Sequence, residues 1–211
     1  MNKNSLYLIF IVVLLGFNVF LVLKIKKLKQ QQNEAFISIQ NEKISEIDAI
    51  ESQENSTYYN LEVAFKSEHL SLKKDLKVIN HKLDTLPLSE VVDQGRIVYN
   101  YSETHCEMCI NAELDLIKQI SSNEYDRVIV LINYQEIRNL VIEKRKLQRL
   151  GLDNLQIYLL SKPLQLPVEN IGFPYYFYLD ETMKTQHVFI PYKHFPSLSQ
   201  DYLQTTLENF F

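Results

Sequence analysis

The chain has 211 residues, of which 46% are hydrophobic and 23% charged, and its formal net charge is -4. This length accommodates one ordinary domain with additional segments, or two small domains. The acidic balance gives no reason to expect a nucleic-acid partner, because domains that bind nucleic acid usually carry a clustered basic face. Two cysteines, three positions apart, cannot form a disulfide scaffold, which indicates that they serve chemistry rather than architecture.

Residues 6–23 form an apolar run without a charged side chain, and we predict a transmembrane anchor over residues 1–25. As a helix, the run nearly spans a hydrocarbon core of about 30 Å. The alternative is a cleaved signal peptide, whose apolar region would be shorter and would end at small residues. Here the run ends at Lys24 without such a site. The sequence therefore predicts a single-pass membrane protein that contacts lipid through residues 6–23.

Residues 26–88 are predicted to form a helical stalk, since neither Gly nor Pro occurs between residues 25 and 86. In the second half, apolar side chains are spaced alternately by four and three residues, at Leu72, Leu76, Ile79, Leu83 and Leu86. This is the heptad pattern of a coiled coil, which makes residues 65–86 a candidate homodimer interface. The alternative is a spacer helix that packs on its own domain. Pro87 is expected to end the helix.

Residues 89–211 alternate between strand and helix patterns, which predicts an α/β domain with a partly parallel sheet. We expect strands over residues 96–101, 127–133, 155–160, 175–179 and 187–190. We expect helices over residues 106–120, 135–150 and 197–210, with Gly151 following the second and Ser197 or Ser199 capping the third.

The segment Cys106-Glu107-Met108-Cys109 opens the helix that follows the first of these strands. The positive end of a helix dipole favours a thiolate at Cys106. The three-residue spacing puts both sulfur atoms on one helix face, close enough to bond. Cys106 is therefore the expected nucleophile, and Cys109 the thiol that resolves a mixed disulfide.

Two neighbours are expected to modulate the thiols. A protonated His105 would lower the pKa of Cys106, whereas Glu107 would raise it. Two other readings of the segment stay open: a metal site, for example for copper, formed by His105, Cys106 and Cys109, and a redox-inert pair in a non-enzymatic interaction module.

The segment Ile171-Gly172-Phe173-Pro174-Tyr175 precedes a strongly apolar strand. Together with the CxxC and the element order from residue 96 onward, it resembles the thioredoxin superfamily. The additional strand near residue 155 makes the chain most similar to membrane-anchored TlpA-like redoxins. The resemblance implies that Pro174 is a cis-proline and forms, with Phe173, the edge that docks substrate.

The sequence departs from that family at several places, among them the Glu107-Met108 pair where thioredoxins have Gly-Pro, and Phe173 and Tyr175 beside the proline. His105 stands where thioredoxins usually carry Trp, and residues 97–101 contain no acid to match the buried Asp of thioredoxins. We therefore expect an exchanger of narrow specificity rather than a general thioredoxin.

The expected function is membrane-tethered thiol–disulfide exchange with an unidentified protein client. The chain has no Gly-rich nucleotide fingerprint, so we expect no cofactor, and electrons must come from a partner protein. The lysines that follow the apolar run favour a cytoplasmic domain. The resemblance implies an extracytoplasmic domain, which we adopt because long domains can translocate despite flanking charges.

Overall fold

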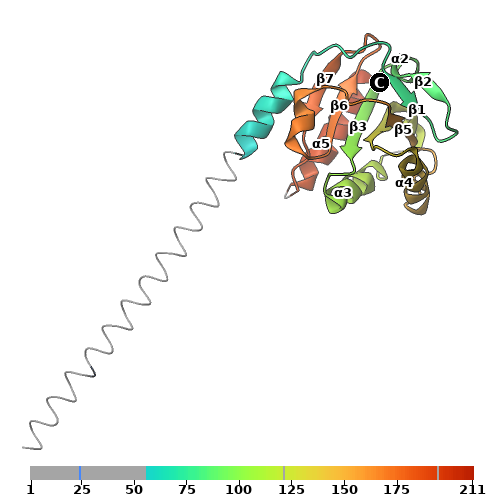
Figure 1. Ribbon diagram of the computed structural model, residues 1–211. Helices are drawn as coiled ribbons and strands as arrows, with labels where there is room; N and C mark the ends of the chain where they lie inside the picture. The colour runs from blue at the N-terminus through green and yellow to red at the C-terminus, as the bar shows by residue number, and fades with distance from the viewer. Residues whose placement is uncertain (1–23, 25–55, 121, 194) are drawn as a thin grey trace, which may run out of the picture. The chain divides into compact units, whose positions relative to one another are not determined.

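The computed structural model describes residue 24 and residues 56–120, 122–193 and 195–211 (Figure 1). The predicted anchor, apart from Lys24, and the stalk up to residue 55 lie outside the described residues. Within those ranges, no helix has both the length and the apolar character needed to cross a membrane. The folded unit comprises Thr57–Phe211.

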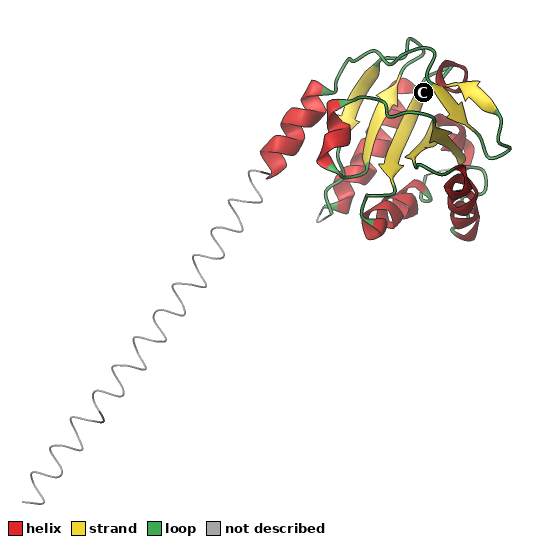
Figure 2. Cartoon of the chain, in the orientation of Figure 1, coloured by secondary structure: helices red, strands yellow, loops and turns green. Residues whose placement is uncertain are grey.

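The described residues form one seven-stranded sheet with the order β2-β1-β5-β4-β3-β6-β7 (Figure 2). Its central strands β3, β4 and β5 are parallel, and all other neighbouring pairs are antiparallel. The strands are β1 (Lys77–Ile79), β2 (Thr85–Pro87), β3 (Arg96–Ser102), β4 (Val128–Asn133), β5 (Gln156–Leu160), β6 (Tyr175–Leu179) and β7 (Thr185–Phe189).

Helices cover both faces of the sheet (Figure 2). One face packs against α3 (Glu107–Ile117), α4 (Ile137–Arg149) and α5 (Pro196–Phe210). The other packs against a helical segment over residues 56–66, α2 (Leu88–Val91) and the 3-10 helix η2 (Pro167–Ile171). A second 3-10 helix, η1 (Ser122–Arg127), precedes β4. The predicted α/β class with a partly parallel sheet is confirmed.

The aromatic strand β6 shows why the sheet is covered on both faces. Tyr175 and Phe177 belong to the core under α2 and η2, whereas Tyr176 and Tyr178 belong to the core under α3, α4 and α5. This is the alternation of a strand, in which successive side chains point to opposite faces. All residues of β6 are buried, so the strand packs in the core.

The start of α5 differs from the sequence prediction. Pro196 occupies the first turn and Phe195 is the N-cap, in place of Ser197 or Ser199. Proline is favoured there because its fixed φ suits a helix and its missing N–H would have no partner in the helix. Ser199 is instead fully buried inside the helix.

The predicted helical stalk over residues 26–88 is wrong at residues 77–87, because these residues form the β1–β2 hairpin at one edge of the sheet. Val78, which is not a heptad position, is fully buried, whereas Leu83 of the expected seam is 54% exposed. Leu83 also has a φ of 70°, which a helix cannot contain. The coiled-coil interface expected over residues 65–86 therefore has no continuous helix to carry it, and Pro87 ends a strand instead of a helix.

The folded unit also begins earlier than the predicted boundary at residue 89. Residues 67–72, which we call the clasp, run along the outer edge of β7. The Thr185 N–H donates to the Leu70 carbonyl at 3.0 Å, and the Leu72 N–H donates to the Met183 carbonyl at 2.8 Å. The buried Ser67 hydroxyl donates to the Val63 carbonyl at 2.8 Å and accepts from the Val168 N–H at 3.0 Å. The clasp is thus part of the domain.

Candidate functional site

The CxxC lies at the end of β3, where the chain turns into α3. Cys106 is the N-cap residue of that helix, and its Sγ accepts a hydrogen bond from the Cys109 N–H at 3.3 Å. Both cysteines are free thiols and partly exposed. A helix N-terminus presents unpaired N–H groups and the positive end of the helix dipole, so Cys106 lies where a thiolate is stabilised.

The two thiols have opposite pKa shifts. The pKa of Cys106 is lowered, chiefly by the hydrogen bond from the Cys109 side chain and next by the bond from the Cys109 N–H. Burial raises the pKa of Cys109 to about 11, and its hydrogen bond to Cys106 adds to this rise. The first thiolate to form is therefore at Cys106, while Cys109 holds its proton at neutral pH.

Lys193, in the connection between β7 and α5, is a functional candidate that the sequence reasoning missed. Its positive charge lowers the pKa of both Cys106 and Cys109. Nothing in the spacing along the chain reveals this, because the lysine and the CxxC are brought together only when α5 packs against α3.

His105 does not supply the positive charge expected from the sequence. Its Nδ1 accepts a hydrogen bond from the Ser102 N–H at 3.2 Å, and burial lowers its pKa. The imidazole is therefore neutral at neutral pH, and its described contact holds the loop between β3 and α3.

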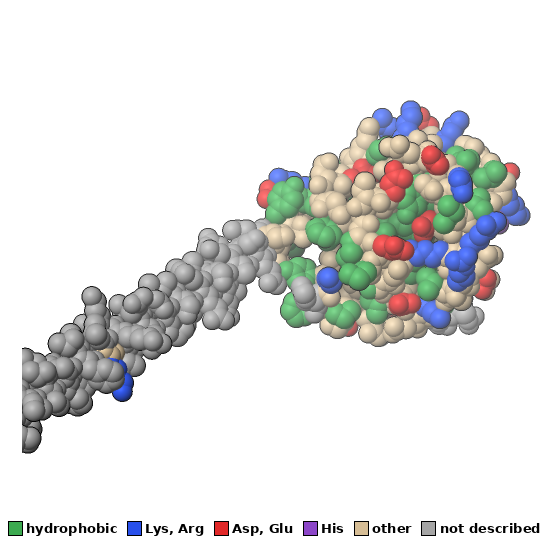
Figure 3. Space-filling view, turned by 60° about the horizontal axis from the view of Figure 1, so that its bottom comes forward, with side chains coloured by type: hydrophobic (Ala, Val, Ile, Leu, Met, Phe, Trp, Pro, Cys, Tyr) green, Lys and Arg blue, Asp and Glu red, His purple; other side chains and the backbone are tan. Residues whose placement is uncertain are grey.

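Glu107, between the cysteines, faces a basic partner on α4. The Lys146 Nζ lies 3.8 Å from Glu107 Oε1 and 4.0 Å from Glu143 Oε2. The buried Glu143 also accepts hydrogen bonds from the hydroxyls of Tyr101 and Tyr134. Lys146 therefore offsets the negative charge that Glu107 brings to the CxxC. Figure 3 shows Lys and Arg side chains gathered on one part of the folded unit, with acidic side chains beside them.

A buried acid is present, although β3 contains none. Glu113 lies one turn beyond Cys109 on the inner face of α3, is 6% exposed, and accepts a hydrogen bond from the Ser199 hydroxyl at 3.2 Å. Burial raises its pKa. In the sequence, Glu113 is an acidic residue among the apolar positions of a predicted amphipathic helix. The apolar pattern alone did not identify it as a buried acid.

The register of the sheet places Pro174 at the end from which β3 leads to the CxxC. Asn100 of β3 is paired with Tyr175, the residue that follows the proline. Pro174 is buried, and Phe173 beside it is 44% exposed. The described residues contain no cis peptide bond, so the cis-proline implied by the resemblance is wrong for this structure. The docking role of Phe173 and Pro174 stays a prediction.

The described residues also bear on the metal reading. Among them, no group of three or more His, Cys, Asp and Glu side chains is placed to hold a metal ion. His187 belongs to no such group, and its ring lies edge-on to the ring of Phe210, with centroids 5.1 Å apart.

No family model and no curated protein matches the chain. Solved structures do. A thiol:disulfide interchange protein from Bacteroides sp. is 16% identical, with 68% of this chain and 91% of that chain covered and a TM-score of 0.45. The thioredoxin domain of a thiol-disulfide oxidoreductase from Bacteroides vulgatus is 17% identical, with coverages of 67% and 96% and a TM-score of 0.45. Yeast Sco1 is 11% identical, with coverages of 67% and 97% and a TM-score of 0.44.

The order of elements is that of a thioredoxin-like domain: parallel β3 and β4 joined through α3, then the antiparallel pair β6 and β7, then the terminal helix α5. The folded unit has a thioredoxin-like fold.

Proposed function

We propose that the protein catalyses thiol–disulfide exchange with a protein client through Cys106 and Cys109. The observation that carries the proposal is the position of Cys106 as N-cap of α3. There its sulfur accepts the Cys109 N–H and its pKa is lowered, while that of Cys109 is raised to about 11. The two neighbouring thiols thus have different roles: Cys106 is the nucleophile, and Cys109 is the thiol that resolves the mixed disulfide.

In the reducing direction, the Cys106 thiolate attacks one sulfur of a client disulfide. The Cys106–client bond forms, the client S–S bond breaks, and the second client sulfur leaves as a thiolate that takes up a proton. Cys109 then loses its proton and attacks the Cys106 sulfur, which forms the Cys106–Cys109 disulfide and releases the reduced client. Two electrons pass to the client, and a dithiol protein must return them for another cycle. The oxidising direction is the reverse sequence.

The raised pKa of Cys109 suits this order of events. A protonated Cys109 does not compete for the client disulfide, and it becomes a nucleophile only after Cys106 has been consumed in the mixed disulfide. We assign the substrate-docking edge to Phe173 and Pro174, because the pairing of Asn100 with Tyr175 brings this segment to the sheet end that carries the CxxC.

The decisive experiment traps the mixed disulfide. In the full-length protein, Cys109→Ser should accumulate a covalent adduct with a peptide disulfide, since nothing resolves it. Cys106→Ser, the matched control, should form no adduct at neutral pH because the Cys109 thiol stays protonated. Mass spectrometry of the intact protein measures both. Equal adduct formation by the two variants, or none by either, would refute the assignment of roles.

We further propose that residues 6–23 anchor the protein and that the folded unit faces the extracytoplasmic side, because 18 successive uncharged residues suit a membrane span. A membrane-impermeant maleimide applied to intact cells labels Cys106 only if the domain is outside. Labelling that requires prior cell lysis would place the domain in the cytoplasm, as the lysines that follow the run suggest.

A further inference from the structure

A cavity opens at the carboxyl ends of the parallel strands, beside the CxxC loop. Its volume is about 660 Å³, and it is bordered by Ser102 and the loop after β3, by the residues after β4, and by the residues after β5. In open α/β sheets, this edge is where ligands bind. The volume falls in the range of ligand sites, which is roughly 300–1,000 Å³.

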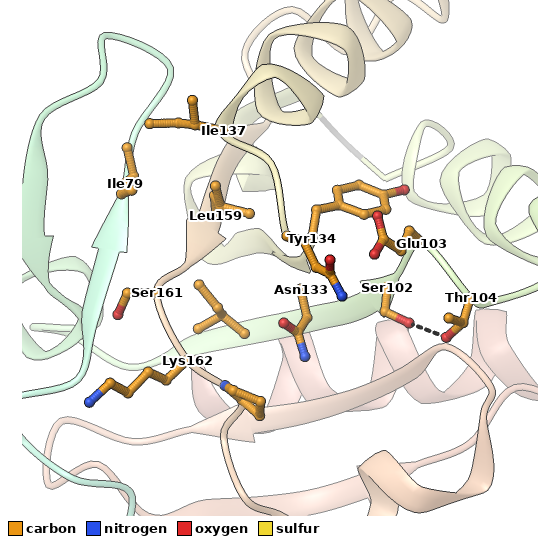
Figure 4. Close-up of a pocket in the computed structure, with 13 residues that line it drawn as sticks. Ile79, Ser102, Glu103, Thr104, Asn133, Tyr134, Ile137, Leu159, Ser161 and Lys162 are labelled. Atoms are coloured by element: carbon orange, nitrogen blue, oxygen red, sulfur yellow. Dashed lines mark hydrogen bonds between the residues drawn. The ribbon is translucent and has the colours of Figure 1, made fainter.

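The lining is apolar at one end and polar at the other (Figure 4). Ile79, Ile137 and Leu159 lie together at the end near β1, and Glu103 and the hydroxyls of Ser102 and Thr104 lie at the end near the CxxC loop, with Asn133 between the two groups. The Ser102 and Thr104 hydroxyls are hydrogen bonded to each other at 2.9 Å. Such a surface suits a ligand that carries both aliphatic groups and amides.

The charges of the lining argue against an anionic small molecule. The cavity is bordered by one cation, Lys162, and by one carboxylate, Glu103, so its charge is balanced. The Asn133 amide forms no hydrogen bond to any described residue, which leaves its donor and acceptor available to a peptide bond. These features together favour an uncharged stretch of polypeptide.

The cavity is continuous with the loop that leads to the nucleophile. Glu103 and Thr104 border it, and they precede Cys106 by three and two residues. A client held on Cys106 through a mixed disulfide must continue as polypeptide on both sides of its reactive cysteine. A flank that runs along residues 103 and 104 would enter the cavity.

We propose that this cavity is a subsite for an extended client segment that flanks the reactive cysteine and carries an aliphatic side chain. The aliphatic side chain contacts Ile79, Ile137 and Leu159, and the client backbone bonds to Asn133. The subsite rests on the proposed exchange function and gives that function its selectivity for polypeptide clients over small disulfides. It lies on the β4 and β5 side of the CxxC, whereas Pro174 lies on the β6 side.

The test uses the reduced full-length protein and two disulfide peptides that differ only in whether leucine or serine flanks the cysteine. The variant Ile137→Ser removes an aliphatic contact from the cavity, and Ile142→Ser is its matched control. Both isoleucines lie on α4 and are 45% and 48% exposed, but only Ile137 borders the cavity. Because both are exposed, neither substitution opens the core.

The measured quantity is the single-turnover second-order rate constant for the leucine peptide, divided by that for the serine peptide. Ile137→Ser should lower this ratio about fivefold to tenfold, which corresponds to losing one aliphatic contact, and Ile142→Ser should keep the wild-type ratio. Equal ratios in the two variants would overturn the subsite while leaving the exchange function intact. A wild-type protein that reduces neither the peptides nor a small aromatic disulfide would overturn the exchange function, and the subsite with it.

Discussion

At the scale of single residues, the site depends on charges that converge on Cys106 from separate parts of the chain. The sulfur is stabilised locally by the Cys109 N–H, in keeping with the predicted position of Cys106 at the start of a helix. Lys193 adds a positive charge from the far end of the sequence, and Lys146 neutralises Glu107 from α4. The hydrogen bond from the Cys109 N–H could be predicted because the geometry of one helix fixes it. The contributions of Lys193 and Lys146 could not, because these lysines approach the CxxC only when α4 and α5 pack.

Lys193 gives the first of the residue-scale predictions. Lys193→Gln should raise the pKa of the Cys106 thiol, because it removes a cation that lowers it. Reaction of Cys106 with an aromatic disulfide at pH 7 should slow by about twofold to threefold, as expected for an exposed charge. Lys184→Gln, in the exposed β6–β7 turn, is the matched control.

The salt dependence separates this electrostatic effect from a structural one. Solvent screening shortens the reach of exposed charges to about 3 Å at 1 M salt. The rate difference between the wild type and Lys193→Gln should therefore shrink as salt rises. A difference that persists at 1 M salt would contradict the electrostatic role.

At the scale of elements, the strands and α-helices after residue 95 could be predicted because most follow one clear pattern, whereas the 3-10 helices η1 and η2 were not predicted. Buried strands such as β4 are continuous apolar runs, and α3 shows an apolar stripe ending near residue 117. The hairpin of β1 and β2 was missed because its turn contains neither Gly nor Pro. The Asn80 side chain builds that turn by accepting the N–H groups of Lys82 and Asp84. Asn80 was therefore the sequence signal for a turn, and it was overlooked because the heptad spacing around it indicated a helix.

Two glycines, Gly95 just before β3 and Gly151 just after α4, make a testable comparison. Gly95 and Gly151 have φ values of 74° and 77°, which side chains other than glycine rarely adopt. A Cβ on Gly151 would meet only the Lys118 side chain at 3.7 Å, whereas a Cβ on Gly95 would overlap the Tyr178 hydroxyl. Tyr178 cannot easily move, because its ring stacks on Phe210.

We expect Gly151→Ala to lower the free energy of unfolding by about 1 kcal/mol, from backbone conformation alone. Gly95→Ala should cost about 1–3 kcal/mol more, because overpacking adds to the backbone term. Urea denaturation of the two variants measures both values. Equal losses in the free energy of unfolding would show that the Tyr178 side chain moves away from the added methyl group without a cost in stability.

At the scale of the whole molecule, stability should depend on pH through the buried Glu113. Burial raises its pKa in the folded state above the usual value near 4.5. The folded state therefore binds this proton more tightly than the unfolded state does. The resulting stability is complete below the unfolded pKa and is lost as pH rises through the folded pKa.

Glu113→Gln removes this titration while keeping an oxygen for the Ser199 hydroxyl. At pH 7.5 the variant should exceed the wild type in free energy of unfolding by about 1 kcal/mol, because it no longer buries a charge. At pH 4 the two proteins should be equally stable. Glu208→Gln, at an exposed position of α5, is the matched control for the loss of one carboxylate. A Glu113→Gln variant less stable than wild type at pH 7.5 would mean that the carboxylate is needed for packing.

The clasp has a mechanical consequence. Tension on the chain ahead of residue 56 first reaches the helical segment 56–66, which packs on the sheet through Val63. It then reaches the bonds that residues 67–72 make with Thr185 and Met183, on β7 and the turn before it. That strand is the outermost on its side, and β3, which leads to the CxxC, is separated from it by β6. A pull from the N-terminal side is therefore spread along the sheet margin before it reaches the sulfur atoms, so their spacing stays independent of how the chain is held.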